Sequence, residues 1–144
     1  MLFRWRTSGR RTGEEKEMSW ESPYFTKEEM QCSHTGLGGM DAKFMDKLTE
    51  LRAAYAKPMV VTSAYRHPTH PIEARKSQPG THSTGRAVDI AVDRGDAWEV
   101  LHLAMAMGFT GIGVQQKGDG RFLHLDNLQP NEFERFMRPT VWSY

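Results

Sequence analysis

The strongest periodic pattern of apolar positions predicts a helix that begins after Asp41. Four apolar residues follow one another at steps of four, three and four positions, which places them on one helical face: Phe44, Leu48, Leu51 and Tyr55. Asp41 is a suitable N-cap residue. Pro58 marks the end of the helical segment, because proline cannot continue a helix.

Two further segments are expected to be helical. Thr26 and Glu29 have the spacing of a capping box, which predicts a short helix over residues 26–31. A longer helix is predicted over residues 96–107, and Gly108 ends it. The inward positions of this longer helix are Val100, Leu101 and Ala104.

Short apolar or alternating runs predict the strands, in this order: residues 59–65, 86–92, 111–114 and 121–126. The first run reads as a buried strand, and the last two flank a Lys-Gly-Asp-Gly turn that predicts a hairpin. Residues 66–85 are rich in Pro, His, Gly, Ser and Thr and are expected to form a long loop. The expected fold class is therefore α+β, a small, largely antiparallel sheet packed with helices.

The length of 144 residues fits one ordinary domain. Residues 1–20 are polar and aperiodic, so we expect a flexible N-terminal arm followed by a single domain over residues 21–144. The one cysteine, Cys32, excludes an intramolecular disulfide. We expect a monomer.

The charge and hydropathy of the chain argue against two classes of partner. Nineteen basic residues face eighteen acidic ones, for a net charge of +1, which lacks the basic surplus of a nucleic-acid binder. No run approaches the roughly 18 apolar residues of a membrane span. The basic N-terminus lacks the apolar core of a signal peptide, so we expect neither membrane insertion nor secretion by that route.

Two ionisable residues stand in otherwise apolar strands. Asp89 lies between Val88 and Ile90, and His124 lies between two leucines, so each needs a polar partner if it is buried. His82 precedes Asp89 by seven residues, at the end of the long loop. Imidazole nitrogen and carboxylate oxygen are good zinc ligands, and two His with one Asp leave a position open for water. The alternative is that these are satisfied core residues.

Three short motifs, taken together, resemble those of the M15 peptidases. The motifs are Ser63-Ala64-Tyr65-Arg66, His82-Ser83-Thr84-Gly85-Arg86-Ala87-Val88-Asp89 and His124-Leu125-Asp126. The M15 peptidases are the zinc D-alanyl-D-alanine carboxypeptidases and related peptidoglycan peptidases, phage endolysins included. The likeness runs in order from about residue 24 to residue 144 and is greatest to the short phage-type branch, where an ending like Trp142-Ser143-Tyr144 is familiar. It implies the M15, hedgehog-like peptidase fold.

The resemblance also implies roles for individual residues. His82, Asp89 and His124 would bind Zn²⁺ at the sheet. Arg66 would bind the substrate beside the cleaved bond and stabilise the developing oxyanion, with Tyr65 and Ser83 as further substrate contacts. The alternative for Arg66 is an ion pair with an acidic residue on the surface. Trp142 and Tyr144 are expected either to pack over the cleft or to cap the core.

Two positions depart from the pattern of the family. Many members have Ser where this chain has Gly80, and several branches place a catalytic Glu or Asp where it has Arg121. Arg121 cannot act as a base. Asp126 shares a strand face with His124 and Phe122, so it is the best substitute as general base. It could instead orient a ligand histidine.

The expected function is zinc-dependent hydrolysis of peptide bonds in peptidoglycan stem peptides or cross-links, by a phage or prophage lysis enzyme. The sequence leaves carboxypeptidase and endopeptidase activity equally open. An enzyme of this kind would be made in the host cytoplasm and act at the bacterial cell wall after release. The alternatives are a catalytically inactive, zinc-containing wall-binding module and a component of the virion.

Overall fold

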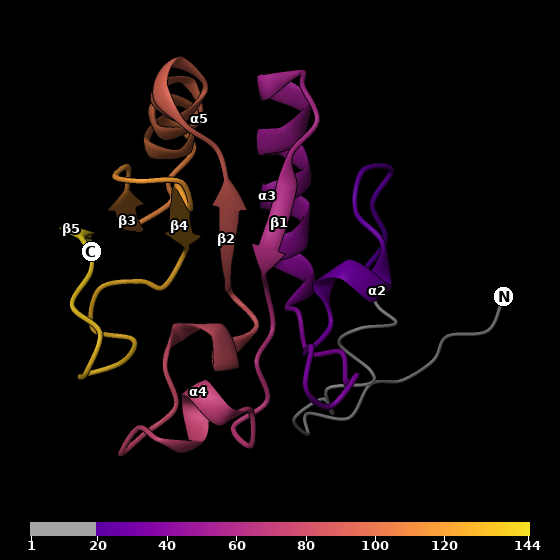
Figure 1. The fold of residues 1–144 in the computed structure, drawn as a ribbon, viewed down its shortest axis with the longest axis vertical. Coiled ribbons are helices and arrows are strands. Elements are labelled where there is room, and N and C mark those ends of the chain that lie inside the picture. Colours follow the sequence, from indigo (N-terminus) through magenta and orange to yellow (C-terminus); the bar gives the residue numbers. More distant parts are fainter. Residues whose placement is uncertain (1–19) are drawn as a thin grey trace, which may run out of the picture.

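The computed structural model describes residues 20–144. The expected N-terminal arm therefore lies outside the described residues, except for Trp20, which is buried in the core. The described elements, in chain order, are α2 (Lys27–Met30), α3 (Ala42–Tyr55), β1 (Val60–Ser63), α4 (Pro71–Ala74), the 3₁₀ helix η1 (Thr81–Thr84), β2 (Ala87–Ala91), α5 (Arg94–Ala106), β3 (Gly111–Gln115), β4 (Phe122–Asp126) and β5 (Thr140–Ser143). They confirm the α+β class (Figure 1).

The three helices expected from the sequence are present, with the predicted caps on the first two. The side chain of Asp41 accepts a hydrogen bond of 3.0 Å from the backbone N–H of Phe44 at the start of α3. Thr26 and Glu29 form the reciprocal capping box of α2. Helix α5 begins at Arg94, two residues before the predicted start.

The described strands form one mixed sheet with the order β1-β2-β4-β3-β5. The pairs β1–β2, β2–β4 and β3–β4 are antiparallel, as expected, and β3 and β4 form the predicted hairpin. Strand β5 was not predicted and runs parallel to β3 at the edge of the sheet. The prediction of a buried first strand was wrong: β1 lies at the other edge, where its residues are exposed or half-buried.

The two faces of the sheet serve different purposes. Alternate residues of β2 and β4 enter the hydrophobic core, where they meet the buried residues of α3 and α5. These strand residues are Val88, Ile90, Leu123 and Leu125. Helices α3 and α5 pack against each other on this side (Figure 1). The residues between them on the same strands, including Asp89 and His124, point to the opposite face. This second face carries the candidate site.

The long loop is more ordered than expected, because it contains α4 and η1. It returns to the sheet through Gly85, whose φ of +75° favours glycine. The Gly85 carbonyl accepts a 2.9 Å hydrogen bond from the N–H of Asp41, and a side chain at Gly85 would collide with the carbonyl of Gly39. Close backbone packing thus joins the end of the loop to the start of α3.

A search of the helices in residues 20–144 found none that combines the length and the apolar character needed to span a bilayer.

Candidate metal centre

The strand register places the site residues in a row across the polar face of the sheet. Asp89 on β2 is paired with His124 on β4, which is paired with Gly113 on β3. Gly113 is paired in turn with Trp142 on β5. Because Gly113 has no side chain, the Trp142 ring reaches across it, and its centroid lies 5.0 Å from that of His124.

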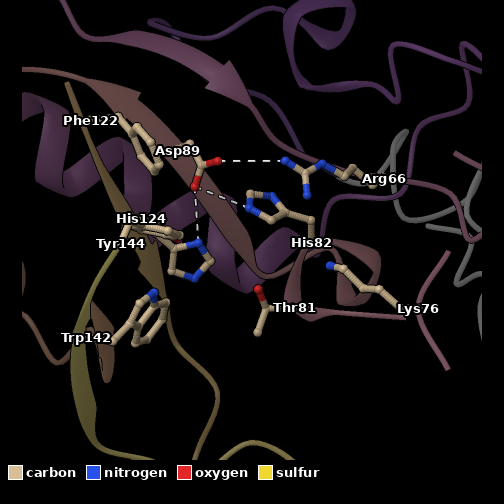
Figure 2. A pocket seen from close by; sticks show the side chains of 9 residues that line it. All are labelled: Arg66, Lys76, Thr81, His82, Asp89, Phe122, His124, Trp142 and Tyr144. Atoms are coloured by element: carbon tan, nitrogen blue, oxygen red, sulfur yellow. Dashed lines mark hydrogen bonds and ion pairs between the residues drawn. The ribbon is translucent and has the colours of Figure 1, made fainter. Parts of the chain in front are cut away.

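Three side chains converge at the centre of this face (Figure 2). Oδ1 of Asp89 lies 3.1 Å from Nδ1 of His124 and 3.3 Å from Nε2 of His82. All three residues are buried, and their potential ligand atoms lie within 4.8 Å of one another. Within residues 20–144 this is the one group of His, Cys, Asp or Glu side chains close enough to hold a metal ion.

Hydrogen bonds made by the outer nitrogen of each histidine ring turn the other, inner nitrogen toward Asp89. Nδ1 of His82 donates to the carbonyl of Ala64 at 2.8 Å, so Nε2 carries the lone pair that faces Asp89. Nε2 of His124 donates to Oδ2 of Asp126 at 2.8 Å, so Nδ1 carries the lone pair on that side. Two oriented imidazoles and one carboxylate fit the preferences of zinc, and this arrangement of outer hydrogen bonds is typical of metal-binding histidines.

The pKa values reflect the mutual attraction of these groups. In the metal-free protein the ring nitrogens that face Asp89 can carry protons instead. Burial opposes ionisation of Asp89, but the hydrogen bonds that His124 and His82 then donate outweigh it and lower the pKa of Asp89. Burial also opposes the charged form of His124, but the hydrogen bonds to Asp126 and Asp89 outweigh it and raise the pKa of His124. A metal cation would therefore compete with a proton for His124.

Asp126 is fully buried and held by a second residue, Arg138. Nε and Nη2 of Arg138 donate to the two carboxylate oxygens of Asp126 at 2.8 and 2.7 Å. Burial opposes ionisation of Asp126, but the hydrogen bonds from His124 and Arg138 keep its pKa below the ordinary value. A Cβ at Gly111 would overlap the Asp126 carboxylate, so this glycine makes room for the pair.

The sequence contains a partial signal for this arrangement. Gly111 and Gly113 alternate on one strand, and glycines inside a strand often mark a close approach of another group. Arg138 had no such signal, because it joins the site through a contact with a distant strand.

A cleft of about 250 Å³ opens over the three side chains. The residues that line it are Arg66, Lys76, Thr81, His82, Asp89, Phe122, His124, Trp142 and Tyr144. The aromatic side chains lie on one side of the triad formed by His82, Asp89 and His124, and Arg66 and Lys76 lie on the other (Figure 2). Trp142 and Tyr144 therefore pack at the cleft, which was one of the two outcomes expected for them.

Arg66 lies at the rim of the triad. Its Nη2 is 3.9 Å from Oδ2 of Asp89, and its Nη1 is 3.2 Å from Oε2 of Glu73, a buried carboxylate that the sequence analysis had not singled out. Ser83 donates a 2.7 Å hydrogen bond to the carbonyl of Arg66. The ring of Tyr65 lies against Gly39.

Arg66 is thus well placed to meet a ligand beside the triad. Ser83 and Tyr65 are not among the described residues that line the cleft, and their contacts with a substrate stay a prediction.

Arg121 takes no part in the cleft. Its Nε donates to the carbonyl of Gly118 at 2.9 Å, within the turn between β3 and β4. Of the described residues that line the cleft, Asp89 is the single carboxylate. A general base is therefore not evident among the acidic side chains at the surface of the cleft.

Comparison with known proteins gave one finding. A family model described as Peptidase M15 matches residues 23–126, a range that includes His82, Asp89 and His124 and ends at Asp126. No curated protein matches the chain, and no solved structure matches it. Arg138, Trp142 and Tyr144, which complete the site in the structure, lie after the matched range.

Proposed function

Because the chain belongs to the M15 peptidase family, we propose that it is a zinc-dependent peptidase that cleaves peptide bonds in peptidoglycan. The observation that carries the proposal is the convergence of His82, Asp89 and His124, with the inner nitrogen of each histidine free to bind a cation. The cleft above them supplies room for a peptide.

His82, Asp89 and His124 would hold the zinc ion. When bound at such a site, zinc polarises a carbonyl group and lowers the pKa of a water molecule toward about 7. The protein's own contribution is to orient the ligands and the substrate around the ion.

Arg66 orients the substrate. Its guanidinium lines the cleft next to Asp89, so it can donate hydrogen bonds to the carbonyl oxygen of the bond to be cleaved. The same donors stabilise negative charge as it develops on that oxygen. Glu73 and the hydrogen bond from Ser83 to the Arg66 carbonyl hold this residue in place.

Asp126 keeps His124 in the tautomer that zinc needs. It accepts the proton at Nε2 of His124 and is itself fixed by Arg138, which leaves Nδ1 of His124 free. The full burial of Asp126 and its bidentate pairing with Arg138 support this orienting role over the role of general base, because a base must reach the proton that it accepts.

The biological setting that we propose rests on the resemblance to the phage-type branch. The enzyme would be made in the host cytoplasm as a monomer and would act on the cell wall after release, as a lysis enzyme does. Carboxypeptidase and endopeptidase activity both fit this setting.

The proposed function is tested with purified cell wall and with defined muropeptides. The zinc-loaded protein is expected to release new amino groups from the wall, and mass spectrometry of the muropeptide digest identifies the bond. His82→Ala, which lacks one ligand, serves as the control and should release none. A wild-type protein that holds zinc but produces no cleavage of either substrate would refute the proposal.

A wall-binding module without activity is the second candidate. It is favoured by one observation: among the described residues that line the cleft, Asp89 is the single carboxylate, so a separate acidic base is not evident. A zinc-loaded protein that sediments with purified wall and leaves every muropeptide intact would identify this function instead. Detection of the chain in assembled phage particles would indicate a virion component.

A further inference from the structure

Lys76 gives the cleft a second cation, which neither the sequence motifs nor the match to the family singled out. Lys76 follows α4 and lines the cleft on the same side of the triad as Arg66 (Figure 2). Its side chain is 43% exposed, so it is open to an incoming ligand. The opposite side of the cleft is aromatic and is formed by Phe122, Trp142 and Tyr144.

A buried carboxylate, Glu73, fixes the position of both cations. Oε2 of Glu73 lies 3.1 Å from Nζ of Lys76 and 3.2 Å from Nη1 of Arg66. Oε1 of Glu73 accepts a 2.7 Å hydrogen bond from the N–H of Gly80. Burial opposes ionisation of Glu73, but these three donors outweigh it and lower its pKa, so it is a carboxylate at neutral pH.

Lys76 is the less fully paired of the two cations at this end of the cleft. Both share Glu73, and Arg66 also lies 3.9 Å from Oδ2 of Asp89, whereas the ion pairs found within residues 20–144 give Lys76 no carboxylate besides Glu73. Nζ of Lys76 also lies close to the backbone of Gly80, where an added Cβ would be 2.8 Å away. The absence of a side chain at Gly80 thus gives the ammonium group its place beside η1 and the cleft.

We propose that Lys76, beside Arg66, forms a subsite for a carboxylate of the substrate and gives the enzyme its preference for anionic peptides. This inference rests on the proposed peptidase function, since it concerns the peptide bound in the same cleft. The proposed metal ligands lie between the cationic and the aromatic sides of the cleft. The carboxylate of the peptide would therefore lie on one side of the cleaved bond, and the residues that contact the aromatic side chains would lie on the other. The carboxylate comes either from the C-terminus of the peptide or from an acidic side chain.

Three synthetic stem peptides distinguish these sources. All three have the same D-residue before the bond to be tested, and they differ in the residue after it: D-Ala with a free carboxylate, D-Ala amide, and D-Glu amide. The zinc-loaded wild type is expected to show a kcat/KM at least about tenfold higher for one of the two anionic peptides than for the D-Ala amide, because a charge-assisted hydrogen bond at a half-exposed site contributes about this factor. The anionic peptide that is preferred identifies the source of the carboxylate.

Variants at Lys76 test the role of the residue. Lys76→Met is expected to reduce the preference for the anionic peptide about tenfold, whereas Lys76→Arg, which keeps the charge, retains most of it. Lys57→Met is the matched control, because Lys57 is likewise an ion-paired lysine with a side chain that is about half exposed; its partners are Asp96 and Glu99. Lys57 is not among the residues of the cleft, and its variant should behave as the wild type.

The outcomes separate this inference from the proposed function. Equal kcat/KM values of the wild type for all three peptides would overturn the inference and leave the peptidase function standing, as would an unchanged preference in Lys76→Met. If the wild type cleaves none of the peptides, their dissociation constants are measured by calorimetry with the same variants. Tighter binding of an anionic peptide that is lost in Lys76→Met would then support the subsite, and equal binding would overturn it.

Discussion

Arg138 offers the sharpest test of how the site is held together. Arg138→Met keeps an unbranched apolar stem but removes the guanidinium group, together with its charge and its position over the rings of Phe136 and Trp142. The carboxylate of Asp126, which has no exposed surface, then loses both hydrogen bonds from the guanidinium. Removal of one partner from a buried ion pair typically destabilises a protein by about 3–5 kcal/mol.

The structure places the expected loss near the lower end of that range. Asp126 keeps its hydrogen bond from His124, and the carboxylate can take up a proton when Arg138 is absent. We therefore expect the free energy of unfolding to fall by about 3 kcal/mol at neutral pH. Urea unfolding at a fixed zinc concentration measures this change. Arg135→Met is the matched control, because Arg135 also lies over the Phe136 ring but hydrogen-bonds to an exposed carbonyl rather than to a buried charge.

A double variant separates stability from metal binding. Arg138→Met combined with Asp126→Asn removes both charges, so most of the lost stability should return, to within about 1 kcal/mol of the wild type. The zinc affinity should stay low in the double variant, because His124 has lost its carboxylate partner. A loss below about 1 kcal/mol in Arg138→Met alone would refute the reasoning, and so would a double variant no more stable than the single one.

Further predictions concern the ligands, the pH dependence and the turn at Gly85. His82→Ala should lose most bound zinc and unfold at a lower temperature, and an unchanged zinc content by elemental analysis would contradict the ligand assignment. Asp126→Asn should weaken zinc binding about 10–100-fold in a chelator competition assay; a loss of kcat with unchanged affinity would instead identify Asp126 as the base. Because the folded pKa of Asp126 is lowered, its stabilisation of the metal-free protein is present above about pH 4 and is lost as the pH falls through the folded pKa. Urea unfolding across this pH range should show a flatter dependence for Asp126→Asn, and identical slopes would argue against it. Gly85→Ala should lower the free energy of unfolding by more than about 2 kcal/mol, from left-handed strain and a collision with the Gly39 carbonyl. Gly36→Ala, with a similar φ but open space around it, should lose only about 1 kcal/mol, and equal losses in the two variants would show that the collision is absent.

Local signals in the sequence predicted most of the central fold. The cap at Asp41, the apolar spacing that follows it and the capping box at Thr26 all depend on residues within one or two turns, so they can be read without a structure. Strand alternation similarly indicated that His124 and Asp126 share a face. The exposure of β1 was missed because an apolar run does not reveal its place in the sheet, and β1 lies at an edge.

Contacts between distant segments explain what the sequence did not predict. Strand β5 pairs with β3 across about thirty residues, and the position of Arg138 beside Asp126 depends on that return of the chain. Glu73 and Lys76 lie in a segment whose helices have only four residues each, too short for a periodic pattern. Arg66 was found through a motif, but the other residues on the cationic side of the cleft could therefore not be predicted from the sequence.

The hydrogen bond between Asp41 and Gly85 has a consequence for how the molecule responds to its ion. Gly85 ends the turn that carries His82, and Asp41 caps α3, so the turn and the first residues of the helix are mechanically linked. Loss of the proposed ion would free the turn to loosen, and we expect the loosening to reach the start of α3. The amide protons there should exchange faster with solvent in the ion-free protein, although this helix contributes none of the three proposed ligands.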